Sequence, residues 1–91
     1  MKNVVIIDGS KITSIKALHN ILKKELKLPA YYGENLDALW DVLSEEKEGP
    51  LVIIWQDFDV SKNFLGEYAE KIIQLFKDAQ NEFDGFSYEI K

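Results

Sequence analysis

Two aspartates are the residues of this sequence whose type and spacing most strongly indicate chemistry. Asp37 and Asp41 lie four residues apart in the segment YYGENLDALWD, which runs from Tyr31 to Asp41. In a helix this spacing brings their Cβ atoms to about 5–6 Å, and the repulsion between the like charges costs the helix roughly 0.2–0.5 kcal/mol. A helix built only to fold would have a lysine at one of these positions, so the pair needs an explanation.

Three explanations for the aspartate pair are open. Two nearby carboxylates can have separated pKa values and serve as a general acid and a general base. They can also bind a hard divalent cation, although no calcium loop of the Dx[DN]xDG type is present. The third explanation is a solvated acidic face. Catalytic carboxylates usually line a cleft formed by several elements, whereas these two would stand on the outer side of one helix.

The neighbouring residues favour protein binding over a merely solvated face. No lysine occurs between residues 34 and 46 to pair with the acids, and Tyr31, Tyr32 and Trp40 lie in or beside the acidic run. Exposed aromatic residues are enriched at protein–protein interfaces. We expect Tyr31 to be the exposed ring, Tyr32 and Trp40 to pack at least partly in the core, and Gly33 to shape the turn.

Charge and composition narrow the partner class. The 91 residues carry sixteen acids and eleven lysines, for a net charge of −5, and residues 34–48 alone account for a net −5. This acidic segment predicts a cationic partner. Because the chain has no arginine, which makes most bidentate phosphate and base contacts, direct nucleic-acid binding is not expected.

Other classes of function lack their sequence features. There is no cysteine, and there is no GxGxxG, P-loop, HExxH or GxSxG motif, so no cofactor, metal site or catalytic activity is predicted. The sole histidine, His19, is expected to be a half-buried helix residue. Asp78, beside Ala79 in the last predicted helix, resembles an ordinary solvated carboxylate. The N-terminal apolar run is too short for a signal peptide or a membrane span, which predicts a cytoplasmic protein.

The elements that must position these residues follow from hydrophobic periodicity. A continuous apolar run at 4–7 predicts a strand buried on both faces, 51–55 predicts a second buried strand, and 86–90 predicts a third with one wetter face. Helices are predicted over 12–26, with Thr13 or Ser14 as N-cap, from Asn35 to about residue 45, and over 66–82. A short helical turn, with Asp57 as a possible cap, follows the second strand.

The predicted second helix explains how the aspartates would be held. Asn35 is a good N-cap, and the apolar residues that follow at i, i+3, i+4 and i+7 form one core-facing stripe: Leu36, Leu39, Trp40 and Leu43. The order of elements predicts an α/β fold: a single small domain over residues 1–91, with a three-stranded parallel sheet, right-handed crossovers and three to four helices.

The segment HNILKKELKLPAYYGENLDALWDVL resembles the barstar family of intracellular ribonuclease inhibitors. The similarity extends along the chain through PLVIIW, the F…SK turn and LFKDA. It implies a small parallel sheet packed with helices and tight 1:1 inhibition of a basic secreted, barnase-like ribonuclease by a protein that is monomeric when free. The resemblance places partner contacts at Tyr31, Gly33, Asn35, Leu36, Asp37, Trp40, Asp41 and Asp78. Asp41 would take the place of the RNA phosphate.

The sequence departs from the family pattern at the edge of this site. Glu46 stands where barstar has an exposed tryptophan, Val42 and Asp84 align with its two cysteines, and the loop at 44–49 differs. Two alternatives therefore stay open: a barstar-fold module that binds another basic protein, and a hydrolase that uses the carboxylate pair or a metal. The isomer of the Gly49–Pro50 bond is also open.

Overall fold

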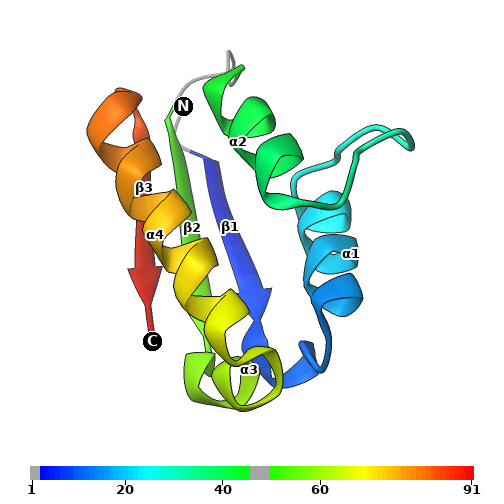
Figure 1. Cartoon of the computed structure of the whole chain (residues 1–91). Coiled ribbons are helices and arrows are strands. Elements are labelled where there is room, and N and C mark those ends of the chain that lie inside the picture. Colours follow the sequence, from blue (N-terminus) through cyan, green and yellow to red (C-terminus); the bar gives the residue numbers. More distant parts are fainter. Residues whose placement is uncertain (1–2, 46–49) are drawn as a thin grey trace.

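The computed structural model describes residues 3–45 and 50–91. Its elements follow the predicted order (Figure 1): β1 (Asn3–Asp8), a 3-10 turn η1 (Gly9–Lys11), α1 (Ile15–Glu25), α2 (Leu36–Ser44), β2 (Leu51–Gln56), α3 (Phe58–Leu65), α4 (Glu67–Glu82) and β3 (Phe86–Ile90). Glu46 and the Gly49–Pro50 bond lie outside the described residues. No helix in the described ranges is both long and apolar enough to cross a membrane.

The three strands form one parallel sheet in the order β1-β2-β3, with Val5, Ile53 and Tyr88 in register across it. Both connections therefore step in the same direction along the sheet. Because parallel crossovers are right-handed, both connections carry their helices to the same face of the sheet. Figure 1 shows α4 in front of β2 and β3, with α1 and α2 beside it. The predicted α/β fold with a parallel sheet is confirmed.

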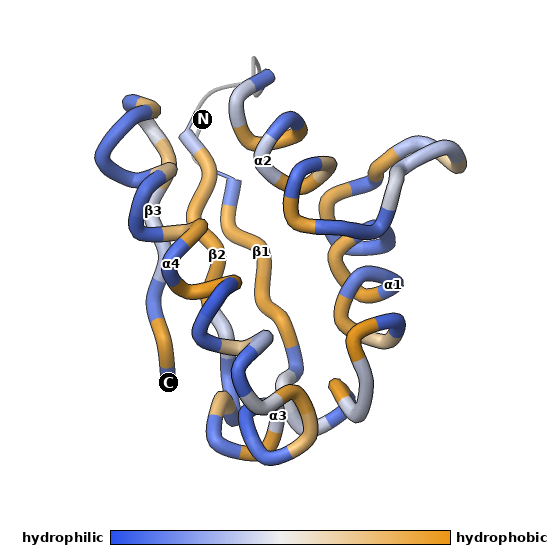
Figure 2. Tube along the Cα trace, viewed as in Figure 1, coloured by the Kyte–Doolittle hydropathy of each residue, from blue (hydrophilic) through white to orange (hydrophobic). Residues whose placement is uncertain are grey.

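The core lies between this single helical layer and one face of the sheet. The sheet contributes Ile7, Ile53 and Trp55, which are fully buried, and Leu51 and Phe86 beside them. Figure 2 shows long hydrophobic stretches along β1 and β2, and hydrophobic residues alternating with hydrophilic ones along the helices. The helices contribute these buried residues to the core: Leu18 and Leu22 of α1, Leu39 and Leu43 of α2, and Ala69, Ile72, Phe76 and Ala79 of α4. Leu39 and Leu43 belong to the apolar stripe that helical periodicity predicts for α2.

The prediction that the first strand is buried on both faces is wrong. Ile7 is buried, but Val4 is 54% exposed and Ile6 is 49% exposed. These two side chains point to the face that no crossover covers, since successive residues of a strand alternate between faces. An apolar run indicates that a strand contributes to a core. The order of the strands decides whether helices cover one face of the sheet or both.

The short helical turn predicted after the second strand is an eight-residue helix, α3. Its expected cap is wrong: Asp57 has a left-handed backbone, with φ of 51°, and its side chain makes no capping hydrogen bond. Instead, Ser61 ties α3 to the sheet, because its Oγ accepts from Trp55 Nε1 at 2.9 Å and donates to the Gly9 carbonyl at 2.8 Å. A side chain at Gly9 would collide with the carbonyl oxygens of Gln56 and Asp57, so η1 packs backbone to backbone against the junction between β2 and α3.

Candidate protein-binding site

The helix α2 is a well-anchored platform. The Oδ1 atom of Asn35 accepts a hydrogen bond from the Ala38 amide at 2.7 Å, which confirms the predicted N-cap. Leu39 is fully buried in the core, and the Trp40 ring packs on Phe83 with ring centroids 4.9 Å apart. The predicted apolar stripe therefore faces inward and holds the opposite side of α2 toward solvent.

The carboxylates on the outer side of α2, Asp37 and Asp41, are exposed and form no ion pair with any residue that the structure describes. Within residues 3–45 and 50–91 the one ion pair joins Lys62 to Glu70 at 3.1 Å, so neither Asp37 nor Asp41 is neutralised there. Asp41 lies in the last turn of α2, which contains no basic residue. An acid at that end of a helix is destabilised by the negative pole of the macrodipole. Asp37 lies in the first turn, where the macrodipole favours an acid, so it is Asp41 whose charge the folding of α2 does not favour.

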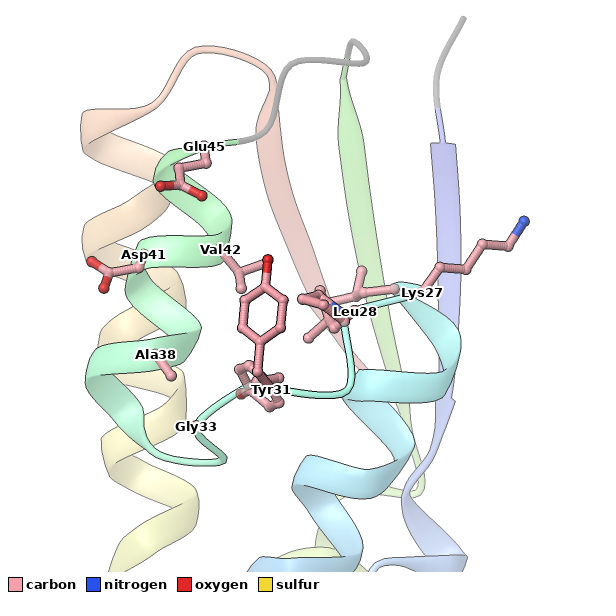
Figure 3. A pocket seen from close by; sticks show the side chains of 11 residues that line it. Lys27, Leu28, Tyr31, Gly33, Ala38, Asp41, Val42 and Glu45 are labelled. Carbon is pink, nitrogen blue, oxygen red and sulfur yellow. The ribbon is translucent and has the colours of Figure 1, made fainter.

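A groove of about 730 Å³ runs along one side of α2, between the helix and the segment that connects it to α1. Tyr31, whose side chain is 88% exposed, lines this groove together with Gly33 and Asp41. Figure 3 shows the Val42 side chain of α2 next to the Tyr31 ring, while the Asp41 carboxylate projects from α2 away from that ring. The exposed tyrosine confirms the sequence expectation, and the groove is open to a partner's side chains.

A second, shallower groove of about 340 Å³ lies on the other side of α2, against α4. Asp78 lines it together with residues of α2: Leu36, Asp37 and Trp40. The carboxylate of Asp78 is oriented by Gln74, whose Nε2 donates to Oδ1 at 2.9 Å. The fold thus brings Asp78 to the groove that Asp37 lines, although the two residues are 41 positions apart in the sequence. Residue patterns alone did not predict that they are neighbours.

The eight residues singled out from the sequence therefore lie along or beside α2. Tyr31, Gly33 and Asp41 line the first groove, Asn35 caps the helix between the two grooves, and four residues line the second: Leu36, Asp37, Trp40 and Asp78. Sequence reasoning missed Lys71 and Gln74, which also line the second groove. The spacing of Gln74 and Asp78, at i and i+4 on a helix, is the pattern that could have revealed the pair.

The loop that carries Tyr31 is shaped by backbone conformations that side chains rarely adopt. Lys27 ends α1 with φ of 55°, and Leu28 N donates to the Lys23 carbonyl at 2.8 Å, which is the Schellman pattern without its usual glycine. At the other end Glu34, with φ of 52°, rather than Gly33, is the left-handed residue. Gly33 instead allows close packing, because a Cβ there would lie 3.2 Å from that of Ala38.

The histidine expected to be half-buried is fully buried. Both ring nitrogens of His19 are hydrogen bonded, Nδ1 to the Tyr32 hydroxyl at 2.9 Å and Nε2 to the Tyr68 hydroxyl at 2.7 Å. Burial lowers the pKa of His19 below its ordinary value, against a smaller opposing effect of Glu34. Burial likewise raises the pKa values of Tyr32 and Tyr68. These three groups are therefore neutral near pH 7.

Comparison with known proteins identifies the family of this chain. The family described as Barstar (barnase inhibitor) matches residues 2–91. A protein of Bacillus subtilis (strain 168) named "Putative ribonuclease inhibitor YrdF" is 44% identical over 78 residues, which cover 86% of this chain and 86% of that protein. A family match over nearly the whole length, with a relative this similar, leaves no ambiguity of class: the chain belongs to the barstar family.

Proposed function

We propose that this protein is a non-catalytic inhibitor that binds and covers the active site of a basic secreted ribonuclease, in a 1:1 complex. The observation that carries the proposal is the exposed pair Asp37 and Asp41, which forms no ion pair within residues 3–45 and 50–91. The pair stands on a helix anchored in the core, with the exposed Tyr31 ring on the preceding loop, in a chain of the barstar family. The family is described by barnase inhibition, and the Bacillus subtilis relative is named for inhibition of a ribonuclease.

The mechanism follows from what a ribonuclease active site must recognise. A site that holds an RNA phosphate presents cationic hydrogen-bond donors, and a carboxylate can accept the same charge-assisted bonds. In the proposed complex Asp41 accepts the bonds that the phosphate would receive. Asp37 lies one turn away and faces neighbouring cations of the enzyme. The inhibitor thus competes with substrate without offering a bond to cleave.

The remaining site residues provide surface and position. On the second groove, Leu36 and Trp40 supply apolar surface on which the methylene groups of a long cationic side chain can pack. Asp78, oriented by Gln74, adds a further acceptor at that groove. Asn35 acts mainly through its cap, because it fixes the first turn of the helix that bears both aspartates.

Calorimetric titration of a barnase-type ribonuclease with this protein tests the proposal. We expect one binding site per molecule and stoichiometric loss of RNA cleavage as the protein is added. A mononucleotide that occupies the enzyme's active site is the matched probe of where binding occurs, since it should compete with the protein. Binding that leaves nucleotide affinity unchanged would contradict active-site occlusion, and absence of binding would contradict the proposed function.

The two alternatives from the sequence correspond to other outcomes. If ribonucleases are not bound but another basic protein binds with dependence on Asp41, the chain is a barstar-fold module for that protein. If the isolated chain shows hydrolytic turnover that is lost with EDTA or in Asp37→Asn, the carboxylate pair is catalytic. Among the described residues no three His, Asp or Glu side chains are gathered as metal ligands.

A further inference from the structure

A buried chain of hydrogen bonds links the loop between α1 and α2, which carries Tyr31 and Gly33, to the helix α4. The hydroxyl of Tyr32 in the loop is hydrogen bonded to Nδ1 of His19 in α1 at 2.9 Å. Nε2 of the same ring is hydrogen bonded to the hydroxyl of Tyr68, in the first turn of α4, at 2.7 Å. Tyr32 is 13 residues from His19 in the sequence, and Tyr68 is 49 residues from it. Three segments that are not neighbours in the sequence therefore meet at one imidazole.

The two hydrogen bonds of the His19 ring have opposite donor and acceptor roles. A neutral histidine has one N–H donor and one nitrogen acceptor, so one tyrosine hydroxyl accepts a hydrogen bond and the other donates one. Both ring nitrogens are satisfied, and no buried side-chain nitrogen or oxygen of the described residues lacks a partner. Loss of either hydroxyl would leave a buried ring nitrogen unpaired, which structures normally avoid.

The loop between α1 and α2 is anchored by the side chain of Tyr32, which is hydrogen bonded to His19. From residue 29 to residue 35, Tyr32 is the only buried residue. Its neighbours Tyr31 and Gly33 are exposed, and both are proposed to touch the partner. The amide of Tyr32 also donates to the Pro29 carbonyl at 3.0 Å, so the position of Tyr32 determines how the adjacent residues are presented.

We propose that Tyr68, acting through His19, is a positioning residue for partner binding: it holds Tyr32 and thereby presents Tyr31 and Gly33 in the geometry that the partner recognises. This inference rests on the proposed function for the identity of the partner. Its physical basis is pre-organisation, because a loop already held in its bound arrangement loses less conformational entropy on association. Tyr68 itself makes no contact with the partner in this proposal.

The test compares Tyr68→Phe with Ser61→Ala. Tyr68→Phe removes one hydroxyl and keeps the ring. Ser61→Ala removes a hydroxyl from the other buried network, which joins Trp55, Ser61 and Gly9 beside α3. Figure 1 shows α3 at the carboxyl ends of the strands, far from the loop between α1 and α2. Both variants lose stability, so a purely structural role predicts equal effects on binding at a temperature where both are folded.

We expect Tyr68→Phe to raise the dissociation rate of the ribonuclease complex by about three- to tenfold and Ser61→Ala to leave it unchanged. In the free protein, amide hydrogen exchange at Tyr32 and Gly33 should be faster in Tyr68→Phe than in Ser61→Ala. Tyr32→Phe breaks the other end of the chain and should reproduce both effects, which keeps the test decisive if Tyr68→Phe does not fold.

Equal dissociation rates and equal exchange rates in the two variants would overturn the positioning role. Failure of the wild-type protein to bind any ribonuclease would instead overturn the proposed function. The exchange measurement needs no partner, so it still decides whether Tyr68 orders the loop. The two failures are therefore distinguishable.

Discussion

At the scale of single residues, the acidic face of α2 opposes folding. Asp37 and Asp41 repel each other at i and i+4, and Asp41 lies near the negative pole of the helix. Each of these effects is worth a few tenths of a kcal/mol to about 1 kcal/mol, and the favourable position of Asp37 in the first turn offsets part of them. A small domain has little stability to spare, so charges placed in this way are better explained by recognition than by folding.

The variant Asp41→Asn separates the effect of the Asp41 charge on folding from its effect on binding. It keeps the shape of the side chain and removes its charge, so the free energy of unfolding should rise by a few tenths of a kcal/mol in urea denaturation. Affinity for the ribonuclease should fall about tenfold or more, since a hydrogen bond to a charged group contributes roughly 1.5–3 kcal/mol. Titration calorimetry measures this loss.

The matched control for Asp41→Asn is Glu89→Gln, which changes an exposed charge on β3. Glu89 is in register with Ile54 of β2, and Ile54 is in register with the exposed Ile6 of β1, so the three side chains lie on the same face of the sheet. It removes one negative charge from the face of the sheet opposite the helices. Its effect on affinity should be small and should disappear at high salt. Equal losses of affinity in the two variants would refute a specific role for Asp41.

His19 makes stability depend on pH with a defined sign. Burial lowers its pKa in the folded protein below the ordinary 6.5, so the unfolded chain takes up a proton that the buried ring resists. The stabilisation is fully present above about pH 6.5 and declines as the pH falls through and below that value. Urea denaturation between pH 8 and pH 5 should show this decline. The contribution should be missing in His19→Gln, and an unchanged slope in that variant would assign the decline to other groups.

At the scale of elements, the one-sided sheet follows from the order of its strands. Because β1, β2 and β3 are adjacent in sequence order, two right-handed crossovers place every helix on one face. A sheet whose strand order reverses direction would have helices on both faces. The single helical layer is also what exposes the outer side of α2 and its two flanking grooves.

Neighbouring residues of β1 test this one-sided burial. Ile7 is fully buried, whereas Ile6 is about half exposed. Ile7→Thr should lower the free energy of unfolding by about 2 kcal/mol or more, because it removes core volume and buries a hydroxyl. Ile6→Thr should cost well under 1 kcal/mol, since threonine suits an exposed strand position. Similar losses for the two variants in urea denaturation would mean that the second face is covered in solution.

At the scale of the whole molecule, charge and fold act together. The net charge is −5, and the segment with the densest acidity, residues 34–48, includes the outer side of α2. An acidic surface of this kind attracts a cationic partner over distances longer than direct contact. The same charge keeps copies of the protein apart, because they repel one another.

Salt should therefore act mainly on the rate of association. Between about 0.05 and 0.5 M salt, the association rate constant with a basic ribonuclease should fall by tenfold or more. The dissociation rate should change much less, because it reflects short-range contacts that salt screens weakly. Stopped-flow mixing measures both rates, and a salt-insensitive association rate would contradict electrostatic steering.

The local features of this protein can be read from its sequence alone. The cap at Asn35, the inward stripe of α2, the exposure of Tyr31 and the order of strands and helices were all predictable, because capping and periodicity depend on residues within a few positions of one another. The family resemblance was equally visible, since it rests on one long, specific segment, YYGENLDALWD.

Contacts between residues that are distant in the sequence became visible only in the folded molecule. It exposed Val4 and Ile6, buried His19 between Tyr32 and Tyr68, and brought Asp78 to the groove beside Asp37. The physical reason is that hydrophobic periodicity records which side of an element is apolar. It does not record which other element will cover that side, because that depends on strand order, crossover handedness and the packing of helices over the whole chain.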